Sequence, residues 1–195
     1  MRAVPTAVSG SQLVSSRGVP GTAGALARTL HDGRRVVLST WHVLYGEGAD
    51  GSCVFDDGSA GGALYGKLGI VQNVHVDCAV ASYDGDDDCA MRGHAPARIG
   101  QRVTKSGAAT GTTRGVIVSV DASDDVVIDG RTMRTSQQLL VRSVDAMPFS
   151  DEGDSGALLL DDDDRAVGLL WGVNTHGDGV ACPIAPVLYA MNITL

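Results

Sequence analysis

The chain has 195 residues and a formal net charge of −8, with 44% hydrophobic and 19% charged residues. This length fits one compact unit or one fold of two fused halves, and the composition excludes a chain that is disordered throughout. The sequence shows no basic patch for nucleic acid and no run approaching the roughly 18 apolar residues of a membrane span. The 26 glycines and 21 aspartates, against only 2 glutamates, favour turns and short strands over long helices.

Strand-like apolar runs recur about every 8 to 12 residues with Asp-Gly turns between them, which is the spacing of an all-β protein. The first set of predicted strands is Ala23–Leu30, Arg35–Ser39, Ser52–Phe55, Gly66–Gln72 and Cys78–Tyr83. After a stretch with Gly and Pro at residues 92–100, the second set is Gln101–Lys105, Gly115–Asp121, Val126–Asp129, Gln137–Val144, Gly156–Leu160 and Ala166–Trp171. Pro183 and the apolar spacing that follows it predict a terminal helix ending near Met191.

Two similar strand sets around one linker predict two small antiparallel β-barrels. We expect an N-terminal barrel over residues 1–98. Residues 99–195 would form the C-terminal barrel and the short helix, and the two barrels would act as one unit.

The turn Gly153-Asp154-Ser155-Gly156 precedes an apolar strand and contains a candidate nucleophile, although such a turn can also be a simple polar connection. A serine hydroxyl needs an adjacent base, usually a histidine that is oriented by a buried carboxylate. His42 directly follows an apolar strand and is the candidate base. Asp77 heads another apolar strand and is the candidate acid, because burying a carboxylate without a partner is costly. His75, two residues earlier, could line the same cleft.

In the order His, Asp, Ser, these motifs resemble those of the trypsin-like (chymotrypsin-fold) serine peptidases. The matching segments are Ser39-Thr40-Trp41-His42, Asp77-Cys78-Ala79-Val80 and the turn around Ser155. The resemblance covers nearly the whole chain, and the segment from Cys182 to Leu188 is similar to intracellular bacterial and plant members of the Nal1 type. It implies an all-β fold of two six-stranded-type barrels, with the active site in the cleft between them.

The resemblance also implies a role for each residue. Ser155 would attack the scissile carbonyl, His42 would take its proton and return it to the leaving amine, and Asp77 would orient His42. The backbone N–H groups of Gly153 and Ser155 would form the oxyanion hole. The implied activity is that of a serine endopeptidase with a protein or peptide substrate. The sequence predicts no cofactor and no metal, since His-Glu-x-x-His is absent.

A primary substrate pocket is implied as well, with Phe149 and Ser150 inside it and Trp171 and Gly172 at its border. Phe149 stands six residues before Ser155, where the family places the pocket floor. An aromatic floor offers no countercharge to a substrate Arg or Lys, so we expect cleavage after uncharged residues.

The sequence departs from the secreted members of that family in two ways. The cysteines that flank their histidine and serine are missing, and no activation segment is evident. Asp154, which in those members pairs with a newly formed amino terminus, therefore needs another cation. The candidates are Arg114, Arg134 and Arg142.

No export signal is evident, and none of the 4 cysteines forms a Cys-x-x-Cys pair. These features predict a cytoplasmic protein with reduced thiols, and the resemblance implies a bacterial one. A regulatory protein partner or homo-oligomer could supply the control that an activation segment would otherwise give. The second function left open is a catalytically inactive binding module on the same fold. The presence of all three triad residue types favours the peptidase.

Overall fold

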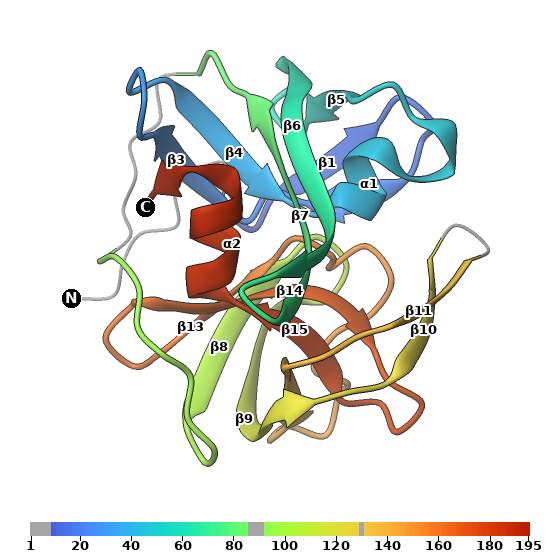
Figure 1. Ribbon diagram of the computed structural model, residues 1–195, viewed down its shortest axis with the longest axis vertical. Helices are drawn as coiled ribbons and strands as arrows, with labels where there is room; N and C mark the ends of the chain where they lie inside the picture. Colours follow the sequence, from blue (N-terminus) through green and yellow to red (C-terminus); the bar gives the residue numbers. More distant parts are fainter. Residues whose placement is uncertain (1–8, 86–91, 129–130) are drawn as a thin grey trace.

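The structure is a computed structural model that describes residues 9–85, 92–128 and 131–195 (Figure 1). Strands of the first half form one eight-stranded antiparallel sheet in the order β16-β3-β4-β7-β6-β5-β1-β2. These strands are β1 (Gln12–Ser15), β2 (Pro20–Thr22), β3 (Ala25–Thr29), β4 (Arg35–Ser39), β5 (Ser52–Phe55), β6 (Ala60–Val71), β7 (Val74–Ser82) and, from the end of the chain, β16 (Ile193–Thr194).

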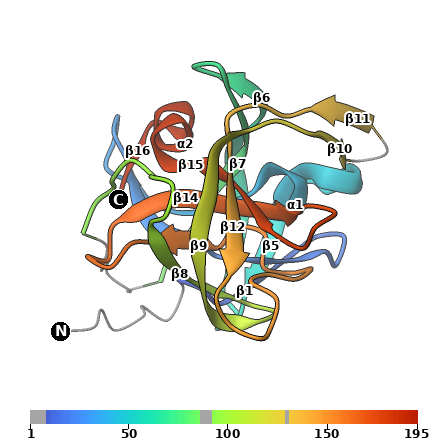
Figure 2. The same cartoon turned by 90° about the horizontal axis from the view of Figure 1, so that it is seen from below.

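Strands of the second half form a closed six-stranded barrel in the order β12-β15-β14-β13-β8-β9. They are β8 (Arg102–Gly107), β9 (Gly111–Ala122), β12 (Gln138–Ser143), β13 (Leu158–Leu160), β14 (Ala166–Val173) and β15 (Gly179–Pro183). Between β9 and β12 the chain makes a separate hairpin of β10 (Asp125–Ile128) and β11 (Arg131–Arg134), which projects to one side of the barrel (Figures 1 and 2). The predicted all-β double-barrel fold is confirmed, with the second barrel closed and the first a half-barrel sheet.

Each predicted strand has a counterpart in the structure, and two have the predicted bounds, β4 and β5. The final residue of the predicted strand Val126–Asp129 lies outside the described residues. The structure adds the short helix α1 (Trp41–Tyr45), the 3-10 helix η1 (Gly46–Gly48) and the strands β1, β2, β11, β15 and β16. Such elements of two to five residues are too short to show a clear period in the sequence.

The predicted terminal helix is α2 (Ile184–Met191), which begins after Pro183 and ends at Asn192 in a left-handed conformation with φ 51°. Its apolar face, including Val187 and Leu188, is buried. The helix packs against β7 and β14, so it lies between the two halves (Figure 1). No helix in the described part of the chain has the length and apolar character needed to cross a membrane.

Three cysteines are buried free thiols: Cys53, Cys78 and Cys182. Burial raises the pKa of the Cys53 thiol to about 11 and raises the pKa of Cys182 well above its ordinary value, so neither sulfur is a ready nucleophile. The fourth, Cys89, lies outside the described residues.

We therefore expect dithiothreitol to leave the melting temperature unchanged. Losing a native disulfide costs about 2–5 kcal/mol, and 1 kcal/mol shifts the melting temperature of a chain of this size by about 2–4 °C. Differential scanning fluorimetry with and without reductant would detect such a change easily. A drop of several degrees under reductant would show that a disulfide supports the fold.

Candidate active site

His42 lies on α1. This helix directly follows β4, which ends at the interface between the two halves. Thr40, before the helix, has extended backbone, with φ −97° and ψ 154°, and α1 begins at Trp41. The turn of helix directs the His42 ring toward β7, and the side chain is 25% exposed. A base in this position is held by the protein and is still accessible to a substrate.

Asp77 lies on β7 and its side chain is completely buried. Its Oδ2 lies 2.6 Å from His42 Nδ1, and its Oδ1 accepts the backbone N–H of His42 at 3.1 Å. Because the carboxylate can only accept, the short contact assigns the proton to Nδ1 of the neutral ring. The other ring nitrogen, Nε2, is then the one with a lone pair for a proton.

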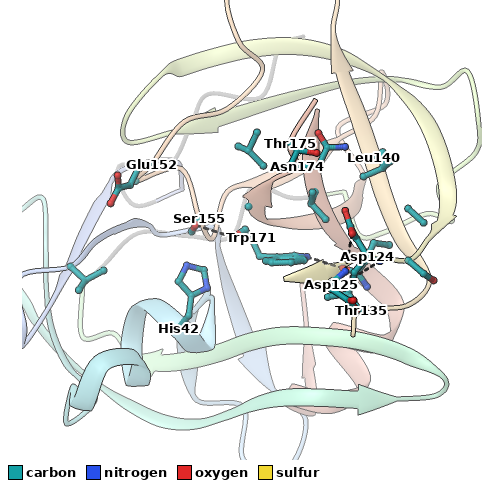
Figure 3. A pocket seen from close by; sticks show the side chains of 18 of the residues that line it. His42, Asp124, Asp125, Thr135, Leu140, Glu152, Ser155, Trp171, Asn174 and Thr175 are labelled. Carbon is teal, nitrogen blue, oxygen red and sulfur yellow. Dashed lines mark hydrogen bonds between the residues drawn. The ribbon is translucent and has the colours of Figure 1, made fainter. Parts of the chain in front are cut away.

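Ser155 lies in the tight turn that precedes β13. Its Oγ donates to the carbonyl of Trp171 at 3.2 Å. The backbone of the turn is held by bonds to both halves: Thr22 N–H donates to the Ser155 carbonyl at 2.8 Å, and Gly156 N–H donates to the Leu170 carbonyl at 2.8 Å. Figure 3 shows the side chains of Ser155 and His42 at the same end of the cavity that both residues line.

Two glycines give this turn its shape. Gly153 has φ +99° and Gly156 has φ +103°, which is a region that side chains with a Cβ rarely adopt. A Cβ on Gly156 would lie 2.2 Å from the carbonyl oxygen of Thr22, so only glycine fits there. The Gly153 carbonyl accepts the hydroxyl of Thr22 at 2.9 Å. Within residues 9–85, 92–128 and 131–195, the N–H groups of Gly153 and Ser155 donate to no protein acceptor.

Asp154 is buried and forms an ion pair with Lys105, whose Nζ lies 2.8 Å from Oδ2; both side chains are at most 1% exposed. The carboxylate also accepts N–H groups of Ala109, Thr110 and Asp151 at 2.9, 3.1 and 3.1 Å, and the Thr110 hydroxyl at 2.6 Å. Burial alone would raise the pKa of Asp154, but the hydrogen bonds from Lys105 and Thr110 outweigh it and lower the pKa. The ion pair and these bonds anchor the residue next to Ser155.

The expectation that an arginine would pair with Asp154 is therefore wrong. Arg114 pairs with Asp145, Arg134 with Asp125 and Arg142 with Asp178, all with exposed guanidinium groups. Lys105 occupies the position instead because it lies on the inward face of β8, between buried Val103 and Gly107. A charged residue in the inward register of a strand was the sequence signal for it, since a buried ammonium needs a carboxylate partner.

A cavity of about 540 Å³, a size typical of ligand pockets, runs along one side of Trp171. His42 and Ser155 lie at one end of it, and Asp124 and Asp125 of the hairpin base lie at the other, with Trp171 between them (Figure 3). The catalytic candidates thus open onto an elongated groove. No group of three or more side chains suited to holding a metal ion occurs among the described residues.

The four residues predicted for the substrate pocket divide into two pairs. Trp171 and Gly172 line the cavity, and open space surrounds the position that a Cβ on Gly172 would take. Phe149 and Ser150 are not among the lining residues. Phe149 is completely buried in the barrel core, and its ring packs against Gly115 and Gly179, where a Cβ would lie 2.9 and 2.7 Å from ring carbons.

His75 also lies apart from the cavity. It is 1% exposed on β7, and its ring centroid is 6.3 Å from that of Trp171. Burial lowers the pKa of His75, although the charge of Asp77 acts in the opposite direction. His75 is therefore a neutral side chain of the core beneath Trp171.

Comparison with solved structures identifies the fold. A protein described as a glutamic acid specific serine protease that utilizes a novel histidine triad in substrate binding has a TM-score of 0.75 and 19% identity, over 96% of this chain and 98% of that one. Nocardiopsis protease has a TM-score of 0.71 and 19% identity, over 96% and 97%. Thermobifida fusca protease A has a TM-score of 0.67 and 18% identity, over 96% and 97%. This chain therefore has the fold of the chymotrypsin-like serine proteases.

The family of the chain is a more specific assignment than its fold. The family model for the Nal1 C-terminal domain matches residues 66–181, which is more than half of the chain, and the chain belongs to that family. The match confirms the resemblance to Nal1-like members, and the segment from Cys182 to Leu188 that indicated it lies just beyond the matched range. A search of curated proteins gave no match.

Proposed function

We propose that this protein is a serine endopeptidase that cleaves protein substrates through an acyl-enzyme. The observation that carries the proposal is the 2.6 Å contact between His42 and the fully buried Asp77, at the end of the cavity that Ser155 also lines. A buried carboxylate that orients a partly exposed imidazole beside a serine is the arrangement that activates a serine hydroxyl.

In the proposed mechanism, Nε2 of His42 takes the proton of Ser155 Oγ as the oxygen attacks the scissile carbonyl. A serine side chain turns between staggered rotamers, so Oγ can exchange the Trp171 carbonyl for the imidazole. The imidazolium is stabilised by Asp77 and then gives its proton to the leaving amine. Water, activated by the same ring, hydrolyses the ester and restores Ser155.

Charge develops on the carbonyl oxygen when the tetrahedral intermediate forms. The N–H groups of Gly153 and Ser155 would donate to this oxyanion, and they are suited to it because the turn leaves them without a protein acceptor within the described residues. The bonds from Thr22 to the turn and the ion pair of Asp154 hold these donors in place before substrate arrives. Preorganised donors of this kind supply much of the rate of acyl transfer.

The shape of the site supports a peptide as the substrate. The cavity is long enough to reach from Ser155 to the base of the β10–β11 hairpin, as an extended peptide requires (Figure 3). We keep three further expectations as part of the proposal: a cytoplasmic location, control by a regulatory partner or self-association, and cleavage after uncharged residues.

Peptide-library profiling tests the cleavage preference. We expect cuts after uncharged residues, because Trp171, Gly172 and Val180 line the cavity and no Lys or Arg is among its described lining residues to accept an acidic side chain. Dominant cleavage after Arg or Lys would contradict this preference and would point to a countercharge among Glu152, Asp124 and Asp125, which also line the cavity.

Reaction with a fluorophosphonate probe tests the proposed function itself. The wild-type protein should be labelled on Ser155, and the label should be absent in Ser155→Ala and in His42→Ala, as read by peptide mass spectrometry. His31→Ala is a matched control, since this histidine is 61% exposed and pairs with Asp32 at the surface. A folded wild-type protein that takes up no label would instead support the inactive binding module.

A further inference from the structure

A buried glutamine connects the wall of the cavity with the strand that carries Asp77. Gln138, the first residue of β12, is 1% exposed. Its Nε2 donates to the carbonyls of His75 and Ser136, each at 2.8 Å. Its Oε1 accepts the indole N–H of Trp171 at 2.8 Å. Both amide hydrogens and the amide oxygen are therefore used.

This set of partners fixes the orientation of the amide. If the amide were flipped, its NH₂ would face the indole N–H, and its oxygen would face two carbonyls. No other side chain of this size presents two donors on one atom and an acceptor on the other, except asparagine, which is one methylene shorter. An apolar residue would leave the indole N–H buried without this partner and would remove a donor from each of the two carbonyls, at about 1–3 kcal/mol for each group left unpaired.

The three partners of Gln138 belong to different parts of the site. Trp171 lies along the cavity, and its carbonyl accepts Ser155 Oγ. His75 is two residues before Asp77 on β7. Ser136 lies at the base of the β10–β11 hairpin, and its carbonyl also accepts the N–H of His75 at 3.1 Å. The Gln138 side chain thus links three parts of the site by hydrogen bonds: Trp171 in the cavity wall, the strand β7 that carries Asp77, and the base of the β10–β11 hairpin.

We propose that Gln138 is a positioning residue that fixes the indole of Trp171 as a rigid surface for the substrate chain. This inference rests on the proposed peptidase function. A peptide that extends along the cavity must pack on Trp171, whereas the hydroxyl of Ser155 and the His42–Asp77 pair do not touch Gln138 in any hydrogen bond of the described residues. Loss of the glutamine should therefore weaken binding of extended peptides more than it weakens the nucleophile.

The test compares Gln138→Glu with Gln137→Glu. The two substitutions make the same chemical change at neighbouring positions, one buried and one exposed. A carboxylate at 138 cannot donate to the carbonyls of His75 and Ser136. For Gln138→Glu we expect kcat/KM on a quenched peptide library to fall about 10- to 100-fold, mainly through a higher KM, since misplacement by about 1 Å can cost 10². Labelling of Ser155 by a small fluorophosphonate should stay close to the wild-type rate, and Gln137→Glu should change neither quantity.

A second variant acts on the bridge from its other end, at the indole N–H that Gln138 Oε1 accepts. Trp171→Phe keeps an aromatic surface and deletes the indole N–H. It should raise KM in the same way, and the double variant Gln138→Glu/Trp171→Phe should raise it little more than either single change. The Trp171→Phe variant keeps the inference testable if Gln138→Glu alone folds poorly. Additive effects would overturn it.

Other outcomes are equally decisive. Equal losses of labelling and peptide hydrolysis in Gln138→Glu would show general damage to the site, and no loss of either would show that Gln138 has no positioning role; both would overturn the inference. The chain has 2 tryptophans, so the ¹⁵N-indole spectrum reports on Trp171 beside Trp41 without any need for activity. The Trp171 signal should move in Gln138→Glu while that of Trp41 stays. A wild-type protein without labelling would reject the proposed function, and an unmoved Trp171 signal would reject the hydrogen-bonded bridge separately.

Discussion

Replacing Ser155 or His42 with alanine should lower kcat for peptide hydrolysis by about 10⁶-fold, the size of loss seen when a serine protease triad loses its nucleophile or base. Asp77→Asn should lower it by about 10⁴-fold, as the equivalent change does in trypsin. The reason lies in the 2.6 Å contact: an amide at 77 would donate to Nδ1, force the proton onto Nε2 and leave no base facing Ser155. Initial rates on a peptide substrate measure all three effects.

Circular dichroism melts separate chemistry from folding in these variants. His42 is partly exposed and Ser155 lies in a turn, so their alanine variants should melt close to the wild type. His31→Ala should retain full activity. Full activity in Asp77→Asn would show that another acid orients His42, and the triad assignment would then be wrong.

Replacing Lys105 with methionine should abolish most activity and destabilise the protein. Removing one partner of a buried ion pair costs about 3–5 kcal/mol, because the other charge is left unpaired. Lys105 and Asp154 are both almost completely buried, so this range applies. The melting temperature should fall by about 10 °C. Activity should fall because Asp154 anchors the turn that presents Ser155.

The matched control is Lys67→Met, since the chain has only these two lysines and Lys67 is exposed. It should melt and react like the wild type. A Lys105→Met protein with wild-type stability would show that the hydrogen bonds from Ala109 and Thr110 suffice to hold Asp154.

The pH dependence of the melting temperature is a further test of the ion pair between Lys105 and Asp154. The pKa of Asp154 in the folded protein is lowered, so its stabilising contribution is present above the unfolded pKa of about 3.9 and is lost as pH falls through the folded pKa. In Lys105→Met the carboxylate loses its strongest partner and its pKa should rise. The gap in melting temperature between wild type and variant should therefore be widest near neutral pH and narrow toward pH 3. A gap independent of pH would contradict this account.

The order of the motifs and the alternation of apolar residues predicted the fold class, because both are local features of the chain. His42 could be selected because it directly follows an apolar strand, and Ser155 because it stands in a glycine turn. Asp77 could be selected because it directly precedes the apolar run Cys78–Tyr83, although the strand β7 begins earlier, at Val74. Lys105 was missed because its partner is 49 residues away, and pairing across two strands leaves no local pattern. The inward register of Lys105 is visible in the sequence, but nothing local to β8 indicates that its partner is Asp154.

Phe149 shows that position in the sequence does not determine where a side chain points. Its place in the sequence, six residues before Ser155, indicates a pocket floor, yet its ring lies in the barrel core. The direction of that ring depends on the space beside Gly115 and Gly179, on two other strands. The bridge through Gln138 is equally non-local, because its partners lie on β7, on β14 and at the base of the hairpin. Packing between distant strands, rather than the identity of any residue, decided these outcomes.

The C-terminal elements α2 and β16 determine how the two halves of the molecule unfold. β16 pairs with β3, and one apolar cluster includes Ala25 and Val76 of the first sheet, Leu169 of the barrel and Val187 of α2. Neither half can lose its structure without exposing that shared cluster to water. The two halves should therefore denature together in a single cooperative transition. The relative placement of His42 and Ser155, which belong to different halves, would then persist on heating until the whole molecule melts, and thermal inactivation would coincide with global unfolding.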